Sequence, residues 1–358
     1  MSDINDSTTD NSNQEQSLQP QDSAPENDPT ANDNKPAAKD PIQLCHRKIQ
    51  AIRGQITKAI IGQDNVVDLA LVSLLAAGHL LIEGVPGLGK TLLVKSIAKA
   101  ISGDFSRIQF TPDLMPSDVT GHAFFDQKDS SFKVRKGPAF TNLLLADEIN
   151  RAPAKTQASL LEVMQEQQIT IEGTAHTIDK PFMVLATQNP LEQEGTYALP
   201  EAELDRFLLN ATIEYPDAAS EQAIAKMITE GHVGDSFATE QIEAIATVKD
   251  VLTMQKVATT VEVDDSLYAY AVRLVQASRQ WPGIRNGAGP RATIALIRCA
   301  KALVLLRGGQ FVTPDDIKQI ATPVLRHRMS LSAELEIEGV KVTSVIQDIL
   351  EQVEAPRG

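Results

Sequence analysis

The stretch GVPGLGKTLL, residues 84–93, decides how the rest of the chain is interpreted. It fits the pattern G-x-x-x-x-G-K-[ST], with Gly84, Gly89, Lys90 and Thr91 at the defined positions. Glycines let backbone N–H groups converge on phosphate oxygens, and a following helix adds the positive end of its dipole. The pattern therefore predicts a phosphate-binding loop, with Lys90 on the β- and γ-phosphates and the Thr91 hydroxyl on Mg²⁺.

The residues on either side of this loop support that interpretation. HLLIEG, before it, is a short apolar run ended by glycine, as expected of a buried parallel strand. GKTLLVKSIAKAI, after it, has apolar residues at helical spacing. We therefore expect ATP as the cofactor of this loop. The candidate cofactor-binding residues are Gly84, Pro86, Gly87, Leu88, Gly89, Lys90, Thr91 and Leu92.

Two further apolar runs, NLLLADE and PFMVLATQNP, are predicted to be buried strands that end in polar residues. Apolar strands alternating with helices predict an α/β fold, in which a parallel sheet lies between helices. Sites in such sheets gather at the carboxyl ends of the strands. After IEYPD we expect no further strand, so an α/β nucleotide-binding domain (41–216) is followed by an all-α lid domain (217–358). The helices expected in the second domain are 220–230, 239–256, 264–280, 290–307, 314–325 and 343–353.

Residues 1–40 differ in composition from the rest of the chain. They contain nine acidic residues and two lysines, so they carry −7 of the net charge of −14. Ile4 and Leu18 are their large aliphatic residues, which is too little apolar surface to offset the entropy of ordering. We expect a disordered acidic tail, which either keeps the protein in solution or docks a partner.

Composition also disfavours several classes of protein. The 358-residue chain has no apolar run of 18 to 20 residues, so no membrane span is expected, and its N-terminus lacks the pattern of a secretory signal. Cys45 and Cys299 fit no metal or redox spacing, which favours reduced thiols and a cytoplasmic location. The acidic balance disfavours nucleic acid as a partner, because it repels the phosphate backbone.

Acidic and amide residues follow the other two predicted strands. Asp147 and Glu148 end LLLADE, where Asp147 would hold the metal through water and Glu148 would act as general base toward the attacking water. Asn189 follows the next strand and could orient the same water. Taken singly, such residues are most often solvated carboxylates or turn residues. Their order after a phosphate loop favours a hydrolytic site.

Two arginines complete the candidate site. Arg206, in LPEAELDRF, could reach the γ-phosphate held by a neighbouring subunit and neutralise charge in the transition state. Arg291, in GAGPRATIALIRCA, begins a helix of the second domain and could reach back to the phosphates of its own chain. The alternatives are a surface ion pair for Arg206 and an ordinary exposed arginine for Arg291.

With these residues in place, the chain resembles the MoxR family of AAA+ ATPases from about Ile42 to Val353. The motifs GVPGLGKT, DEINRAPAKTQASLLEVMQE, TQNP, EAELDRF and GPRA occur in the order of the family. The resemblance implies Asn189 as first sensor, Arg206 as finger and Arg291 as second sensor. It also implies that Ile61, Gly62 and Gln63, in IIGQDNVV, pack on the adenine.

The resemblance extends to two predicted hairpins and to partners. TGHAFFDQKDSSFKVRKGPAF and QQITIEGTAHTID are expected to form hairpins that either face the pore of a ring and grip a client or pack as surface hairpins. The family implies a homo-oligomeric ring, usually a hexamer, and chaperone-like remodelling of protein clients. It also implies a partner with a von Willebrand factor A domain.

Three other functions stay open at this point. A nucleic-acid motor would need basic inward hairpins; residues 167–179 contain no Lys or Arg, although Lys133, Arg135 and Lys136 lie near the other hairpin. The ATPase subunit of a metal chelatase has related inserts. A scaffold that binds nucleotide without hydrolysing it would not need Glu148.

Overall fold

The structure is a computed structural model and describes residues 40–85, 87–189, 195–229 and 237–356. The expected tail up to residue 39, and Pro86 of the predicted phosphate loop, lie outside the described residues. Asp40, which the sequence assigned to the tail, instead caps the first helix. Its carboxylate accepts the backbone N–H of Ile42 at 2.9 Å.

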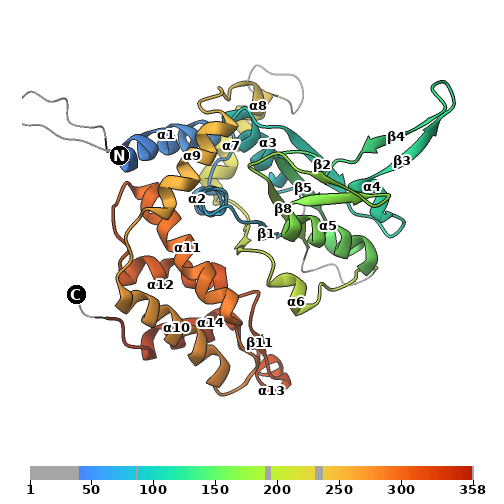
Figure 1. The fold of residues 1–358 in the computed structure, drawn as a ribbon. Coiled ribbons are helices and arrows are strands. Elements are labelled where there is room, and N and C mark those ends of the chain that lie inside the picture. Colours follow the sequence, from blue (N-terminus) through green and yellow to red (C-terminus); the bar gives the residue numbers. More distant parts are fainter. Residues whose placement is uncertain (1–39, 86, 190–194, 230–236, 357–358) are drawn as a thin grey trace, which may run out of the picture. The chain divides into compact units, whose positions relative to one another are not determined.

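A five-stranded parallel sheet forms the centre of the α/β region, in the order β2-β5-β8-β1-β9 (Figure 1). Its strands are β1 (Leu80–Glu83), β2 (Phe105–Gln109), β5 (Leu143–Asp147), β8 (Met183–Gln188) and β9 (Leu209–Thr212). The three strands predicted from apolar runs are therefore confirmed and lie side by side in the sheet. The two edge strands, β2 and β9, contain fewer apolar residues than the three central strands and were not predicted.

Both faces of the sheet are buried, because successive side chains of a strand point to opposite faces. Leu80 and Ile82 join one apolar core, whereas Leu81 between them joins the other. The first core also contains side chains of α1 (Pro41–Ile56), α2 (Asp64–Leu75) and α3 (Lys90–Ala100). The second contains side chains of α5 (Ala154–Glu166). The expected arrangement of a sheet between helices is confirmed.

The region after β9 is mainly helical. Its helices are α7 (Ala218–Thr229), α8 (Phe237–Glu240), α9 (Val248–Thr259), α10 (Asp265–Gln280), α11 (Pro290–Arg307), α12 (Pro314–Leu325), α13 (Ala333–Ile337) and α14 (Val342–Gln352). The central helix α11 packs against α10 and α12, and also against α1 and α2. The domain boundary at residue 217 stays a prediction.

Two predictions for this region are wrong. The expected helix 239–256 is interrupted, because residues 242–247 are not helical and Thr247 starts α9 with its own capping box. Strands do occur after IEYPD: β10 (Ile284–Asn286) and β11 (Ser330–Leu331) form a short antiparallel pair. These three-residue and two-residue strands are too short to give a periodic pattern in the sequence.

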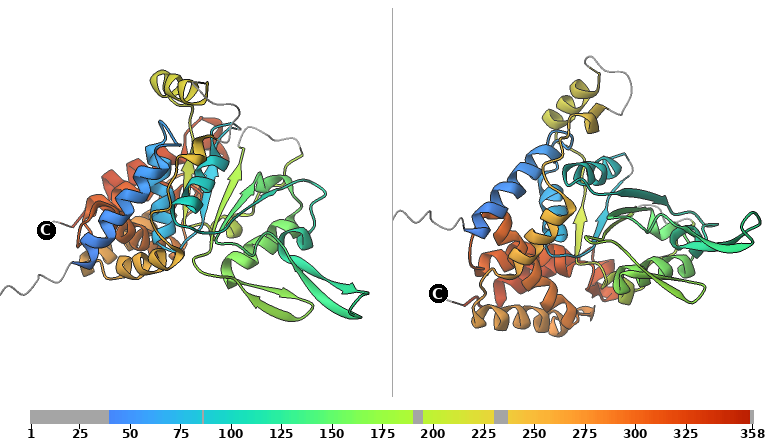
Figure 2. Two further views of the ribbon diagram at one scale, coloured as in Figure 1. Left: turned by 90° about the horizontal axis from the view of Figure 1, so that it is seen from above. Right: turned by 45° about the horizontal axis from the view of Figure 1, so that its top comes forward.

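Both predicted hairpins are present. One is formed by β3 (Gly121–Asp126) and β4 (Ser131–Lys136), after the short helix α4 (Pro116–Thr120), and the other by β6 (Gln168–Ile171) and β7 (Thr174–Thr177). They lie side by side and extend away from the sheet (Figure 2). Within the described ranges, no helix has the length and apolar character needed to cross a bilayer.

Candidate functional site

The predicted phosphate loop connects β1 to α3 and depends on glycine at three positions. A Cβ on Gly84 would lie 2.7 Å from the carbonyl oxygen of Ile213, so the loop leaves the sheet where a side chain does not fit. Gly87 (φ 85°) and Gly89 (φ 78°) adopt left-handed conformations that glycine reaches without steric cost. Gly89 is also the N-cap of α3, so its conformation directs the first backbone N–H groups of that helix toward the loop.

Lys90 and Thr91 occupy the first turn of α3, beside this loop. The Lys90 ammonium donates to the carbonyl oxygen of Gly84, which folds its side chain back over the loop. Burial lowers the pKa of Lys90, while the nearby charges of Asp147 and Glu148 raise it. The half-buried ammonium is therefore close enough to both predicted acidic residues to feel their charge.

Asp147 ends β5 and is held from both neighbouring strands. Its Oδ1 accepts the hydroxyl of Thr187, at the end of β8, at 2.6 Å. Its Oδ2 accepts Nη2 and Nε of Arg107, on β2, at 2.7 and 3.2 Å. The carboxylate therefore has a fixed orientation at the carboxyl edge of the sheet.

Glu148 follows at once and has a left-handed backbone, with φ of 56°. Its N–H donates to the Thr187 hydroxyl at 2.9 Å. Its carboxylate accepts the amide of Gln109 at 2.6 Å and pairs with Arg151 at 3.1 Å. In this arrangement the predicted general base is engaged by two side chains of its own chain.

Asn189 is buried and lies two residues beyond Thr187, at the same edge of the sheet. Since Ala146 is in register with Ala186, β5 and β8 end together. The structure therefore gathers Lys90, Asp147, Glu148 and Asn189 at the carboxyl ends of three adjacent strands, as the sequence predicted.

The segment expected to contact adenine joins the phosphate loop directly. The Gln63 amide donates to the carbonyl oxygen of Leu88 at 3.2 Å. Gly62 has φ of 74°, and a Cβ there would lie 2.7 Å from Ser220 of α7. Together with residues of β9 and α12, Gly62 and Gln63 line a cavity of about 560 Å³, and Ile61 precedes them in sequence.

The two predicted arginines lie elsewhere. Arg206 follows α6 (Glu201–Leu204), and its Nη1 donates to the Leu161 carbonyl at 3.1 Å and to Gln165 Oε1 at 2.6 Å, both on α5. Arg291 lies 3.8 Å from Asp205. Both arginines line a cavity of about 480 Å³ that His79 also lines.

This placement corrects one expectation. His79 precedes β1 and the phosphate loop follows it, so the cavity and the loop lie at opposite ends of a strand about 13 Å long. Arg291 therefore does not reach back to the phosphate loop of its own chain. The sequence could not show this, because the position of Arg291 depends on how α11 packs against distant elements.

The structure also adds residues that the sequence did not single out. Arg107 and Gln109 of β2, and Thr187 of β8, make the contacts that orient the two acidic residues. The register of β2 with β5 places Gln109 beside Asp147. The signal was weak because β2, FSRIQ, mixes polar and apolar residues and is only partly buried.

Mg²⁺ would depend on few protein ligands. In the described part of the chain, no group of three or more His, Cys, Asp or Glu side chains could hold a metal ion. The Thr91 hydroxyl and the Asp147 carboxylate are hard oxygen donors, which suits an ion that keeps several waters and binds phosphate oxygens. The donor set therefore fits Mg²⁺ bound together with a nucleotide.

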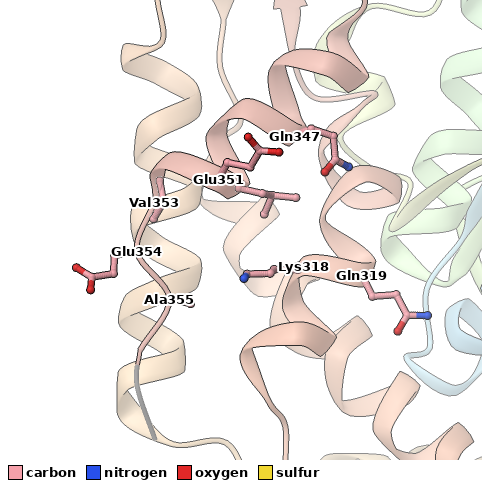
Figure 3. Close-up of a pocket in the computed structure, with 8 residues that line it drawn as sticks. Lys318, Gln319, Gln347, Glu351, Val353, Glu354 and Ala355 are labelled. Carbon is pink, nitrogen blue, oxygen red and sulfur yellow. The ribbon is translucent and has the colours of Figure 1, made fainter.

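A further cavity, of about 460 Å³, lies between α12 and α14 (Figure 3). Its lining includes Lys318 and Gln347 but none of the predicted site residues. It therefore does not enlarge the candidate site.

Comparison with known proteins agrees with this geometry. The family model described as "ATPase family associated with various cellular activities (AAA)" matches residues 79–209, and the model described as "AAA lid domain" matches residues 276–349. A solved structure of a proposed ATPase from Cytophaga hutchinsonii superposes with a TM-score of 0.82 at 40% identity, covering 88% of this chain and 97% of that one.

Two curated relatives are similar over most of their length. Chaperone MoxR1 of Mycobacterium tuberculosis is 40% identical over 85% of this chain and 81% of the relative. The uncharacterized protein YeaC of Bacillus subtilis is 42% identical over 84% of this chain and 92% of the relative. The chain has the fold, the nucleotide-binding loop and the lid of an ATPase, and it belongs to the MoxR family of AAA+ ATPases.

Proposed function

We propose that this ATPase works as a closed homo-oligomeric ring, a hexamer by resemblance to its family, in which each ATP lies between two subunits. The observation that carries the proposal is the separation within one chain. Lys90, Asp147 and Glu148 lie at the carboxyl edge of the sheet, whereas Arg206 and Arg291 line a cavity at the other end of β1. One chain cannot bring both groups to the same phosphate, but a neighbouring subunit can supply the arginines.

Hydrolysis then follows from the residues at the carboxyl edge. Lys90 holds the β- and γ-phosphates, and Asn189 orients a water molecule in line with the γ-phosphorus. As the water oxygen bonds to the γ-phosphorus, the bond to the β–γ bridging oxygen breaks, leaving ADP and phosphate. Glu148 takes the proton of the water, for which its carboxylate must leave Gln109 and Arg151.

Thr91 and Asp147 would hold Mg²⁺, which when bound neutralises charge on the phosphate oxygens. Arg206 of the neighbouring subunit would neutralise the charge that develops on the γ-phosphoryl group. Because Arg291 lies beside Asp205 and lines the same cavity, we propose that it also serves the nucleotide of the neighbour.

Mixed rings test this division of labour. Lys90→Ala should lose ATP binding but keep its arginines, and Arg206→Ala should bind ATP but lose about a thousandfold in turnover. In an equal random mixture, about a quarter of the interfaces join an intact loop to an intact arginine, and turnover should return there. A mixture as inactive as its parts, with subunit exchange verified by native mass spectrometry, would contradict the role in trans.

We further propose that the ring remodels protein complexes, together with a partner that carries a von Willebrand factor A domain. The hairpin β3–β4 supports contact with proteins, because Phe124, Phe125, Phe132 and Val134 are exposed on it. Glu148→Gln should keep ATP bound and retain clients. Affinity capture with this variant should identify them, and adding Phe132→Ser should release them.

A nucleic-acid motor is the runner-up, and the charges of the hairpin weigh against it. Lys133 is paired with Asp126 and Asp129, and Lys136 lies over the ring of Phe140 at 4.9 Å. Stimulation of ATP turnover by DNA that disappears with added salt would favour the motor instead. Metal insertion into a tetrapyrrole would favour a chelatase subunit, and turnover unchanged in Glu148→Gln would favour a scaffold.

A further inference from the structure

The loop that carries Arg206 is held by an arginine of the helical region. Arg328 follows α12, and its side chain is 3% exposed. Its Nε donates to Asp205 Oδ1 at 2.7 Å. Its Nη2 donates to the carbonyl oxygen of Phe207 at 2.6 Å, and its Nη1 to that of Leu208 at 3.2 Å. One guanidinium therefore binds the residues on both sides of Arg206.

His327 adds a second contact from the same segment. Burial lowers the pKa of His327 well below its usual value, so the ring is neutral near pH 7. Its Nε2 lies 3.1 Å from the carbonyl oxygen of Phe207, to which it donates. Phe207 itself is fully buried. The backbone at residues 205–208 thus follows the position of α12.

The side chain of Arg206 is fixed separately, by α5. Its Nη1 binds Leu161 and Gln165, while its buried Nε has no hydrogen-bond partner. A buried donor without a partner carries a free-energy cost, so this docked position is one that the arginine can leave. When the Arg206 side chain leaves α5, its reach depends on the position of the backbone of loop 205–208. Arg328 holds that backbone in place.

α12 also borders the cavity of about 560 Å³ at Gly62 and Gln63, which is the candidate nucleotide cavity. Thr322, Pro323 and Arg326 line the cavity at Gly62 and Gln63. Arg326 donates to the Thr212 hydroxyl, at the carboxyl end of β9. The segment from α12 to Arg328 therefore contacts both the candidate nucleotide cavity of its own chain and the loop that bears Arg206.

We propose that Arg328 is a positioning residue for Arg206, through which α12 couples the candidate nucleotide cavity of one subunit to the arginine that it offers to the next. The proposal rests on the proposed role of Arg206 in trans. Lysine cannot replace Arg328, because one ammonium cannot span the carboxylate and the separate carbonyl groups that the planar guanidinium reaches.

The test compares Arg328→Lys with a matched lid arginine. Arg273, on α10, donates from Nη2 to the carbonyl oxygen of Glu354 at 3.1 Å and is not among the residues that line the cavity of Arg206 and Arg291. In the Glu148→Gln background, Arg328→Lys should bind ATP with unchanged affinity. In the chain that retains Glu148, Arg328→Lys should lose at least about tenfold in kcat, because a displaced arginine misses the phosphoryl group. Arg273→Lys should stay within about twofold of the wild type.

Two further measurements separate positioning from a structural defect. In the Arg206→Ala background, Arg328→Lys should have no additional effect on kcat. Subunits with Arg328→Lys have an intact phosphate loop, so mixing them with Lys90→Ala subunits should restore turnover. Should Arg328→Lys fail to fold, Asp205→Asn, which keeps an oxygen acceptor on a partly exposed side chain, replaces it in both measurements.

The outcomes are distinct for the two proposals. If Arg206→Ala turns over ATP normally, the role of Arg206 itself is wrong. If Arg206→Ala is inactive while Arg328→Lys keeps the wild-type kcat, lowers it further in the Arg206→Ala background, or is not restored by mixing, the role of Arg206 stands and the role of Arg328 is overturned.

Discussion

Thr187 is the residue on which both predicted acidic side chains depend. Its hydroxyl donates to Asp147 and accepts the N–H of Glu148, whose left-handed backbone is uncommon for a residue other than glycine. Backbone strain of this kind is found preferentially at functional sites. Here the strained residue is the predicted general base, and the bond to Thr187 holds it in place.

Removing this hydroxyl should therefore affect stability and metal use together. Thr187→Val leaves the partly buried N–H of Glu148 without its acceptor, which should lower the free energy of unfolding by about 1 kcal/mol. Asp147 also loses the donor to its Oδ1, so half-maximal turnover should need more Mg²⁺. Thermal unfolding and Mg²⁺ titrations measure the two effects. Thr187→Ser keeps the hydroxyl and should restore both; a valine variant with wild-type Mg²⁺ dependence would contradict this role.

The elements show where sequence patterns were sufficient. β1, β5 and β8 are apolar runs buried on both faces, so composition alone revealed them. β2 was missed because an edge strand needs fewer apolar residues, and with it the contacts of Arg107 and Gln109 were missed. The start predicted for the helix 239–256 was wrong, because α9 begins at a local capping box that apolar spacing does not reveal.

The start of α9 offers a direct measurement of that capping box. The Thr247 hydroxyl accepts the N–H of Asp250 at 3.3 Å, and the Asp250 carboxylate accepts the N–H of Thr247 at 2.8 Å. Thr247→Ala should destabilise the protein by about 1 kcal/mol, seen as a lower Tm, because the helix loses its N-cap. Thr247→Ser should keep the wild-type Tm. Equal Tm values for all three proteins would show that the cap contributes nothing.

At the level of the whole molecule, two buried histidines join separate parts of the fold. His79, before β1, accepts the N–H of Val184 at 3.0 Å and lies 3.1 Å from the carbonyl oxygen of Met164 on α5. Burial lowers its pKa from 6.5 to about 4. His327 joins the lid to loop 205–208, and burial lowers its pKa in the same direction. Both rings are neutral in the folded protein near neutral pH.

These pKa shifts predict a loss of stability in acid. Above pH 6.5 both histidines are neutral in the folded and unfolded states, so their protonation does not reduce the free energy of unfolding. Below it the unfolded chain takes up protons that the folded chain refuses, so His79 alone should remove roughly 3 kcal/mol between pH 6.5 and about 4. Tm measured across this range should fall. His79→Asn, whose side chain does not titrate, should flatten the fall, and an unchanged slope would contradict the assignment.

The position of Arg291 marks the limit of what the sequence could predict at this scale. Its helix was expected correctly, but its neighbours were not, because they come from the segments just after α6, just before β1 and just after α12, which are brought together only by packing. The placement of Asp147, Glu148 and Asn189 at one edge of the sheet could be predicted, since parallel strands end together, and their roles stay predictions. Predictions that reach across the molecule needed the structure.

The separation of the phosphate loop from Arg206, at opposite ends of β1, has an arithmetic consequence. If both are needed at each nucleotide, complete sites are counted by interfaces rather than by chains. An isolated subunit then has none, an open row always has one fewer than its subunits, and only closure makes the numbers equal. Specific activity should therefore rise with protein concentration until all rings are closed. Dilution of the protein should then lower the turnover of each subunit.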